Sequence, residues 1–177
     1  MTSANHSMAP TAAEFHRAIQ SRGDRWYSAC LRITHDAQLA EDAVQDALLN
    51  AWRMRDQFQA SAKLDTWIHR IAINSALQLL RKRRPERLPP IDTDTLVSDE
   101  TPETHFVERE LLTDLAQAMV SLSEAERVCF VLKHLEQWRL KEIAQELDMT
   151  IGTVKQALFR AVRKMRTTMP DLRRQQC

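Results

Sequence analysis

Five side chains near the C-terminal end of the chain recur at steps of three and four residues, and a sixth lies beside them. They are Thr153, Gln156, Phe159, Arg160 and Arg163, together with Lys155. Residues three and four apart share one face of a helix. Hydroxyl, amide and cationic groups hydrogen-bond base edges and phosphates. This pattern predicts a helix that contacts DNA.

The segment before this helix has the spacing of a helix-turn-helix in residues 140–165. The residues expected to pack its two helices together are Ile143, Ala144, Leu147, Val154 and Leu158. Thr150 is the expected N-cap of the second helix, which would lie in the major groove. Asp148 stands where glycine is usual in the turn, but Asp can adopt the left-handed conformation. The alternative is an ordinary helical hairpin with a solvated basic face.

The charges are sorted along the chain, although the formal net charge of the 177 residues is only +1. Residues 36–56 hold five acids and two bases, whereas residues 63–87 hold seven bases and two acids. Residues 88–114 hold eight acids and one base, and residues 151–174 hold seven bases and one acid. Near neutrality therefore does not count against nucleic-acid binding.

The composition favours helices. Glycine occurs only at Gly23 and Gly152, whereas hairpins, dinucleotide-binding turns and phosphate loops depend on glycine. Two apolar stripes have helical spacing: Ala40, Ala43, Val44, Ala47, Leu48 and Ala51, then Leu64, Trp67, Ile68, Ile71, Ala72, Ser75 and Leu79. Residues 14–33 are also expected to be helical, with Gly23 as a point where that helix could bend or divide. A capping box is expected at Ser123 and Glu126.

We predict an all-α fold of two small helical domains joined by a flexible linker, the C-terminal domain being the helix-turn-helix. The predicted boundaries are a disordered N-terminus at 1–11, a first domain at 12–87, an acidic linker rich in proline and hydroxyl residues at 88–104, a second domain at 105–170, and a tail at 171–177.

Groups that could form a metal site or a disulfide are scattered. Cys30, Cys129 and Cys177 form no CxxC pair, and the histidines have no metal-ligand spacing. We expect no metal, no cofactor and no catalytic residue. No apolar run has the length of a membrane span or of a signal-peptide core, so we expect a cytoplasmic protein without membrane insertion.

Two motifs, in order across the linker, resemble those of the extracytoplasmic-function (ECF) sigma factors, the small promoter-specificity subunits of bacterial RNA polymerase. LAEDAVQDALLNAWRMRDQF at 39–58 and KLDTWIHRIAINSALQLLRKRRP at 63–85 are similar to the family's AEDxxQ(D/E) run and its TW(L/I)xRIAxN segment. EIAxxL and GTVK, at 142–155, are similar to its second motif. The resemblance implies a non-enzymatic sigma factor that binds core polymerase, recognises the minus-35 and minus-10 elements and promotes initiation at a specific, stress-related regulon.

The resemblance also assigns residues. The residues assigned to bind the coiled-coil of the polymerase clamp are Asp42, Gln45, Asp46, Leu49 and Trp52. Those for the opened minus-10 strand and its flipped base are Phe58, Lys63, Trp67, Arg70, Asn74, Arg81, Lys82, Arg83 and Arg84. Those for the minus-35 element are Thr153, Lys155, Gln156, Phe159, Arg160 and Arg163. The implied partners are core polymerase, through clamp and flap, promoter DNA, and an anti-sigma factor or another regulator such as a Ser/Thr kinase.

Other interpretations of these residues stay open. Asp42 and Asp46 also fit a solvated helix face, Trp67 fits a core position, and Asn74 fits an exposed one. The loop FQASAKLDTW lacks the family's glycine, and Leu64 stands at its usual aromatic place.

Two other functions compete with the sigma-factor interpretation. One is a helix-turn-helix repressor or activator that does not touch polymerase. The other is a carboxylate metalloenzyme using Glu41, Asp42 and Asp46. Hydroxyls that a kinase could modify are Ser61, Thr66, Thr93, Thr95 and Ser98.

Overall fold

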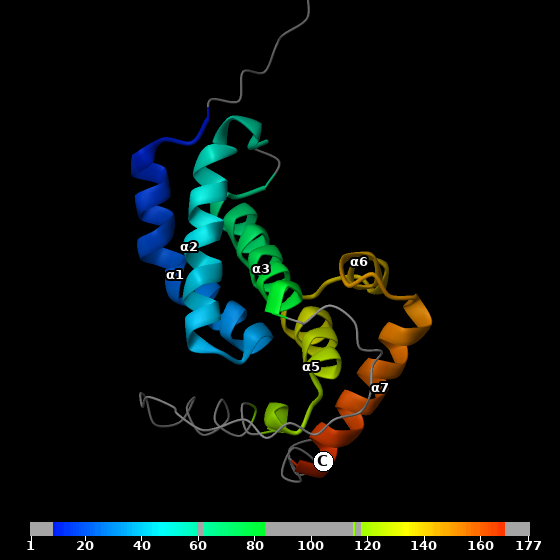
Figure 1. The fold of residues 1–177 in the computed structure, drawn as a ribbon. Coiled ribbons are helices and arrows are strands. Elements are labelled where there is room, and N and C mark those ends of the chain that lie inside the picture. Colours follow the sequence, from blue (N-terminus) through cyan, green and yellow to red (C-terminus); the bar gives the residue numbers. More distant parts are fainter. Residues whose placement is uncertain (1–8, 60–61, 84–114, 116–117, 169–177) are drawn as a thin grey trace, which may run out of the picture. The chain divides into compact units, whose positions relative to one another are not determined.

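The chain forms two compact units, residues 1–87 and 88–177. The computed structural model describes residues 9–59, 62–83, 115 and 118–168 (Figure 1). Every regular element in these ranges is helical, which confirms the predicted fold class. The linker predicted at 88–104 and the tail predicted at 171–177 lie outside the described residues. No helix in the described part is long and apolar enough to span a membrane.

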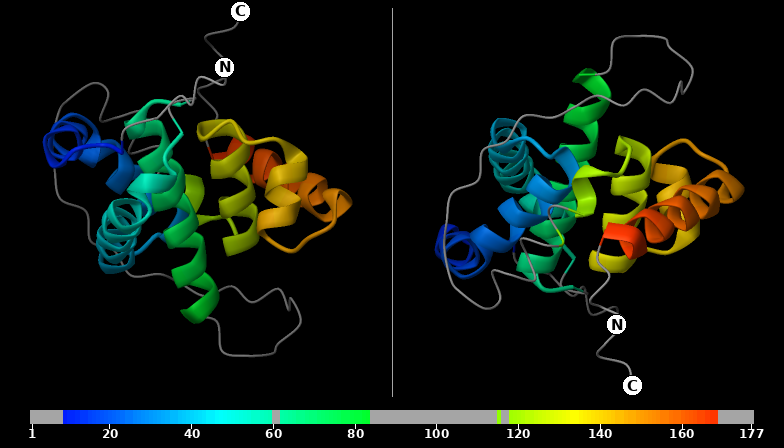
Figure 2. Two further views of the ribbon diagram at one scale, coloured as in Figure 1. Left: turned by 90° about the horizontal axis from the view of Figure 1, so that it is seen from above. Right: turned by 90° about the horizontal axis from the view of Figure 1, so that it is seen from below.

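The first unit is built from three helices that all pack against one another (Figures 1 and 2). They are α1 (Ala12–Thr34), α2 (Ala37–Arg53) and α3 (Leu64–Arg83), and a short 3-10 turn, η1 (Arg55–Gln57), follows α2. Helix α1 is one helix that runs through Gly23, which confirms the helix expected at 14–33, and Gly23 does not divide it. A glycine costs a helix about 1 kcal/mol, and burial of the α1 residues on both sides of Gly23 offsets that cost.

Local chemistry fixes both ends of α1. At its start the Thr11 amide donates to Glu14 Oε2 at 2.7 Å, and the Glu14 amide donates to Thr11 Oγ1 at 3.3 Å. This reciprocal capping box satisfies two amides that the helix leaves without a partner. At its end His35 is left-handed, with φ 54°, and its amide donates to the Leu31 carbonyl.

The core of the first unit differs from both predicted stripes. Helix α2 buries the expected small side chains, Ala40, Ala43, Ala47 and Ala51, whereas Val44 and Leu48 are only half-buried. Helix α3 buries Ile73, Ala76, Leu77 and Leu80 in addition to Ile68, Ala72 and Ser75, whereas Leu64, Trp67, Ile71 and Leu79 are only half-buried. The reason is that α3 packs against both α1 and α2, so a wider and rotated arc of it is covered.

The second unit places the helix-turn-helix on a short support. After α5 (Glu124–Phe130) comes the π-helical turn η2 (Val131–Leu135), followed by α6 (Leu140–Glu146) and α7 (Ile151–Thr168). Helix α7 packs against α5 and α6. The predicted capping box begins α5: the Ser123 amide donates to Glu126 Oε2 at 3.0 Å, and the Glu126 amide donates to Ser123 Oγ at 3.4 Å.

Candidate polymerase and promoter interface

Helix α2 has small residues inward and large residues outward. Its inner face is the four buried alanines. The five residues assigned to polymerase, Asp42, Gln45, Asp46, Leu49 and Trp52, fall within an arc of about 120° on the opposite side, at 100° per residue. Leu49 is 55% exposed and Trp52 is 40% exposed. Exposed apolar side chains grouped with carboxylates are typical of a surface that binds another protein.

The Trp52 ring is held in place although it is exposed. Its ring packs edge-on against Phe15 of α1, with a distance of 5.2 Å between ring centroids. The Arg55 guanidinium lies 4.4 Å from the centre of the Trp52 ring and donates to the Trp52 carbonyl at 2.9 Å. Phe15 and Arg55 therefore support this surface. The sequence pattern indicated neither role: Phe15 lies 37 positions from Trp52, and Arg55 entered the pattern only as one charge of residues 36–56.

Four of the residues assigned to the minus-10 element share one side of α3. Trp67, Arg70, Asn74 and Arg81 fall within an arc of about 60°. Phe58, at the end of η1, brings its ring to 5.2 Å from the Trp67 ring, between centroids, with the planes tilted by 55°. The start of the loop and the first turns of the helix thus form a single aromatic surface. Lys63, which precedes α3, and Lys82, near the other end of α3, are exposed, and Arg84 lies outside the described residues.

Asn74 has an amide oxygen with no partner. Its side chain is half-buried, and the Oδ1 atom is buried without a hydrogen bond to any described residue. A buried polar atom left without a partner costs about 1–3 kcal/mol. Asn74 is therefore neither a simple exposed residue nor a satisfied core residue.

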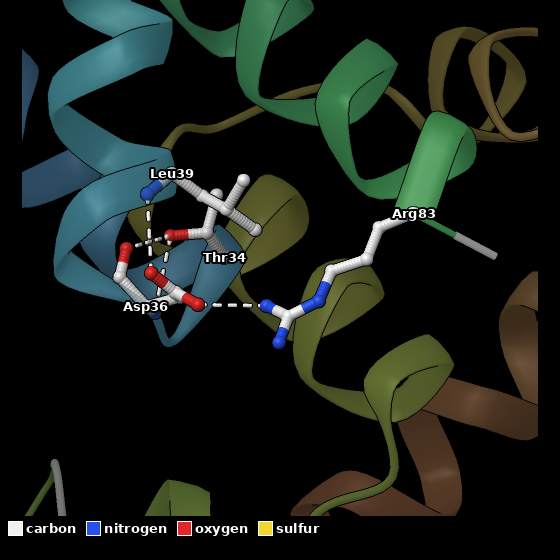
Figure 3. Close-up of polar contacts among 4 residues, drawn as sticks. All are labelled: Thr34, Asp36, Leu39 and Arg83. Carbon is white, nitrogen blue, oxygen red and sulfur yellow. Dashed lines mark hydrogen bonds and ion pairs between the residues drawn. The ribbon is translucent and has the colours of Figure 1, made fainter.

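Arg83 is separated from the other minus-10 residues. It lies about 160° around α3 from Trp67, and its Nη1 forms an ion pair with Asp36 Oδ2 at 2.7 Å (Figure 3). Asp36 is the N-cap of α2, and its Oδ1 accepts the Leu39 amide at 3.1 Å. The hydrogen bond from Leu39, together with Arg83, lowers the pKa of Asp36 below its usual value. Arg83 thus joins the end of α3 to the start of α2, whereas the sequence interpretation had it holding a phosphate.

The turn of the helix-turn-helix has the conformation expected from its sequence. Asp148 is left-handed, with φ 52°. Thr150 Oγ1 accepts the Thr153 amide at 3.1 Å, as an N-cap does. Arg139 offers no side-chain acceptor at the start of α6, and there the Glu142 carboxylate accepts the Arg139 amide at 2.8 Å. One half of a capping box is enough to begin this helix.

All six residues assigned to the minus-35 element are exposed on α7. The opposite face buries Val154, Ala157, Ala161 and Met165. Phe159 is 70% exposed, and with Lys155 and Arg163 it borders an open groove of about 720 Å³. The lining includes four cationic side chains and no carboxylate: Lys133, His134, Leu140, Lys155, Leu158, Phe159, Val162, Arg163, Arg166 and Thr167.

Lys164 lies near these residues in sequence but has a structural partner. Its Nζ is 2.9 Å from Oε2 of Glu126, which is itself buried and accepts the Ser123 amide. This pair fixes α7 against α5 and so sets the rotation of the exposed face. Sequence spacing gave no signal for it, because the partners are 38 positions apart.

Among the described residues, no group of three or more His, Cys, Asp or Glu side chains could hold a metal ion. Cys30 and Cys129 are buried and form no disulfide with a described residue, and one lies in each unit.

Comparisons with known proteins agree on one family. Residues 18–86 match the family model for Sigma-70 region 2, and residues 112–165 match that for Sigma-70 region 4. The chain is 30% identical over 159 residues to the ECF RNA polymerase sigma factor SigW of Bacillus subtilis, covering 84% of this chain and 85% of SigW. It is 32% identical over 144 residues to the RNA polymerase sigma-H factor of Pseudomonas aeruginosa, covering 74% and 73%.

Two solved structures share the fold. One is the sigma factor RpoE of Bartonella quintana in complex with the anti-sigma factor NepR, with TM-score 0.59 and 20% identity over 90% of this chain and 98% of that one. The other is CnrH in complex with the cytosolic domain of CnrY, with TM-score 0.52 and 21% identity over 89% and 88%. Because both regions match and the chain covers 85% of SigW at 30% identity, the protein belongs to the ECF sigma factor family, whose members are non-enzymatic transcription initiation factors.

Proposed function

We propose that this sigma factor directs core RNA polymerase to the promoters of a specific, stress-related set of genes, using three separate helices. The outer face of α2 binds the clamp coiled-coil, the Trp67 side of α3 holds the opened minus-10 strand, and α7 reads the minus-35 element. The observation that carries the proposal is the distribution of apolar side chains on α2, which buries its alanines and exposes Leu49 and Trp52. This distribution has no advantage for an isolated helix bundle, which would gain more from burying the larger side chains.

The chemistry of α3 suits single-stranded DNA. The Phe58 and Trp67 rings offer a stacking surface for an extruded base, because every base has an aromatic face. The buried amide oxygen of Asn74 has no hydrogen-bond partner among the described residues, and the edge of an extruded base bound at this surface would supply one. Arg70, Arg81 and Lys82 are exposed where they can hold backbone phosphates. Arg83 is left out of this set because it lies about 160° around α3 from Trp67.

The fold relatives support a proposal that a protein partner regulates this chain. One of the two structures described above is a complex with an anti-sigma factor, and the other is a complex with the cytosolic domain of CnrY. We propose that an anti-sigma factor or another regulator, such as a Ser/Thr kinase, controls this chain. The sigma factor itself works in the cytoplasm with polymerase. The flap of the polymerase contacts the second unit. Thr66 is exposed on α3. Ser61, Thr93, Thr95 and Ser98 lie outside the described residues.

A pull-down with purified core polymerase, followed by run-off transcription, tests this function. Binding to core and specific initiation are expected together. A chain that binds duplex DNA but not core polymerase would instead be a helix-turn-helix repressor or activator. Transcript profiling after controlled expression, with and without stress, then tests the regulon: stress genes should be enriched among the induced transcripts, and a set without them would overturn that part.

A further inference from the structure

A small cavity lies between α1 and α3, and none of the residues that line it is assigned to polymerase or DNA. Its volume is about 50 Å³, and its lining is Arg22, Arg25, Trp26, Asp65, Thr66 and His69. A single water needs roughly 10–15 Å³, so the cavity has room for several waters or for the oxygens of one phosphate group. Trp26 is buried and forms its apolar wall.

The charges inside the cavity do not cancel. Arg22 Nε lies 3.3 Å from Asp65 Oδ2, while Asp65 Oδ1 accepts the Thr66 amide at 2.8 Å. Both oxygens of the one carboxylate are therefore engaged, and Arg22 and Asp65 neutralise each other. Arg25 has no ion-pair partner among the described residues. Arg25 is an exposed residue that contributes to the lining, so the lining carries one excess positive charge, which matches the single negative charge of a phosphodiester.

The cavity borders the side of α3 that carries Trp67. Thr66 precedes Arg70 by four residues, so the two lie one turn apart on neighbouring strips of the helix. A strand that follows Arg81, Asn74 and Arg70 toward the start of α3 would reach the cavity at Thr66. The hydroxyl of Thr66 and the imidazole of His69 add hydrogen-bonding groups beside the guanidinium.

We propose that this cavity takes a backbone phosphate of the opened promoter strand, with Arg25 of α1 as the cation that binds it. Arg22 is a positioning residue, because its pair with Asp65 neutralises the carboxylate that would otherwise repel the phosphate. The inference rests on the proposed function of α3 and extends the strand-binding surface from α3 onto α1. It assigns no base specificity, since phosphate contacts position a strand without reading it.

The test is fluorescence anisotropy of the full chain with a fluorescein-labelled single strand of mixed sequence, titrated with salt. Arg25→Ala is expected to weaken binding about threefold to tenfold and to reduce the slope of log K against log salt by about 0.7, the value for one phosphate contact on a single strand. Arg25→Lys should recover most of the slope. Arg17→Ala is the matched control, because Arg17 is an exposed cation of α1 that does not line the cavity.

Arg70→Ala separates this inference from the function on which it rests. If Arg70→Ala reduces the salt slope and Arg25→Ala does not, the cavity proposal is overturned and the α3 surface stands. If Arg17→Ala reduces the slope as much as Arg25→Ala, the effect is general charge and the proposal is also overturned. If neither Arg70→Ala nor Arg25→Ala changes the slope, both the α3 surface and the cavity fail. Circular dichroism melting of each variant verifies that it is folded.

Discussion

Single side chains at the proposed interfaces are exposed or left without partners, which makes substitutions there informative. Residues such as Asp46, Phe159 and Arg160 contribute little to the core, because they lie on the outer faces of their helices. Their replacement should change binding much more than folding. The three predictions at this scale use that separation.

Asp46→Arg is expected to weaken binding to core polymerase at least tenfold, because it reverses the charge at the edge of the apolar surface formed by Leu49 and Trp52. The thermal midpoint should stay within a few degrees of the parent. Affinity is measured by competition for core polymerase. Asp24→Arg makes the same charge change on an exposed position of α1 and serves as control. Equal affinity of the parent and Asp46→Arg would rule out this face of α2.

Asn74→Ala is expected to leave the free energy of unfolding unchanged or to raise it by about 1 kcal/mol, since it removes a buried acceptor that has no partner. Promoter opening, measured by permanganate reactivity of unpaired thymines, should fall. A structural role for Asn74 predicts the opposite pair of results: clear destabilisation and normal opening.

Lys155→Ala and Arg160→Ala on α7 should differ in kind. Lys155→Ala is expected to reduce the salt slope of duplex binding by about 1 and to weaken all sequences alike. Arg160→Ala should cost about 1–3 kcal/mol on the cognate minus-35 sequence and relax discrimination there. Binding to cognate and scrambled duplexes distinguishes the two effects. If both variants bind and transcribe like the parent, α7 is not the reading helix.

At the scale of elements, the ends of the helices decide how the faces are presented. The Asp36 carboxylate caps the start of α2 and also forms an ion pair with Arg83 at the end of α3. One carboxylate therefore fixes the relation between the helix proposed for polymerase and the helix proposed for DNA.

Substitutions of Asp36 separate its two tasks. Asp36→Ala should lower the free energy of unfolding by about 1 kcal/mol, the typical value of an N-cap. Asp36→Asn should lower it by a few tenths only, because Asn still caps the helix and an exposed ion pair contributes about 0–1 kcal/mol. Because the folded pKa of Asp36 is lowered, its contribution is complete above the unfolded pKa of about 3.9. It is lost as pH falls through the folded pKa.

Chemical denaturation of the parent and Asp36→Asn between pH 3 and pH 7 measures this dependence. The difference in free energy of unfolding between the parent and Asp36→Asn should shrink toward acid pH. A difference that grows toward acid pH would contradict the pairing of Asp36 with Arg83.

Elements set by neighbouring residues were predictable, and elements set by distant residues were not. The capping box at Ser123, the left-handed Asp148 and the cap at Thr150 each depend on side chains within three positions. The pairing of Arg83 with Asp36 depends on tertiary approach across 47 positions. The arginine-rich sequence at the end of α3 suggested one uniform DNA surface. A helix turns by 100° per residue, however, so Arg83 lies on the opposite side of α3 from Trp67.

For the whole molecule, the two compact units imply that promoter binding depends on linkage. If each unit contacts its own promoter element, joining them raises the effective local concentration of the second for its site. Residues 1–87 and 88–177 supplied as separate chains should lose about 10²- to 10⁴-fold in promoter-specific transcription. Run-off transcription with the separate chains and with the intact chain measures this loss. Undiminished transcription from the separate chains would show that one unit suffices.

Each unit contains one buried cysteine, so the alkylation of that cysteine reports how often its unit opens. Cys30 and Cys129 are both fully covered, and burial raises the pKa of Cys129 to about 11. Thiol reagents attack the thiolate, so alkylation of either cysteine has to wait for its unit to open. The alkylation rate at each cysteine then follows the opening equilibrium of its own helices. Mass spectrometry can measure the alkylation rates of Cys30 and Cys129 in the same sample. Comparing these rates with and without a bound partner would show whether the partner protects one unit, the other, or both.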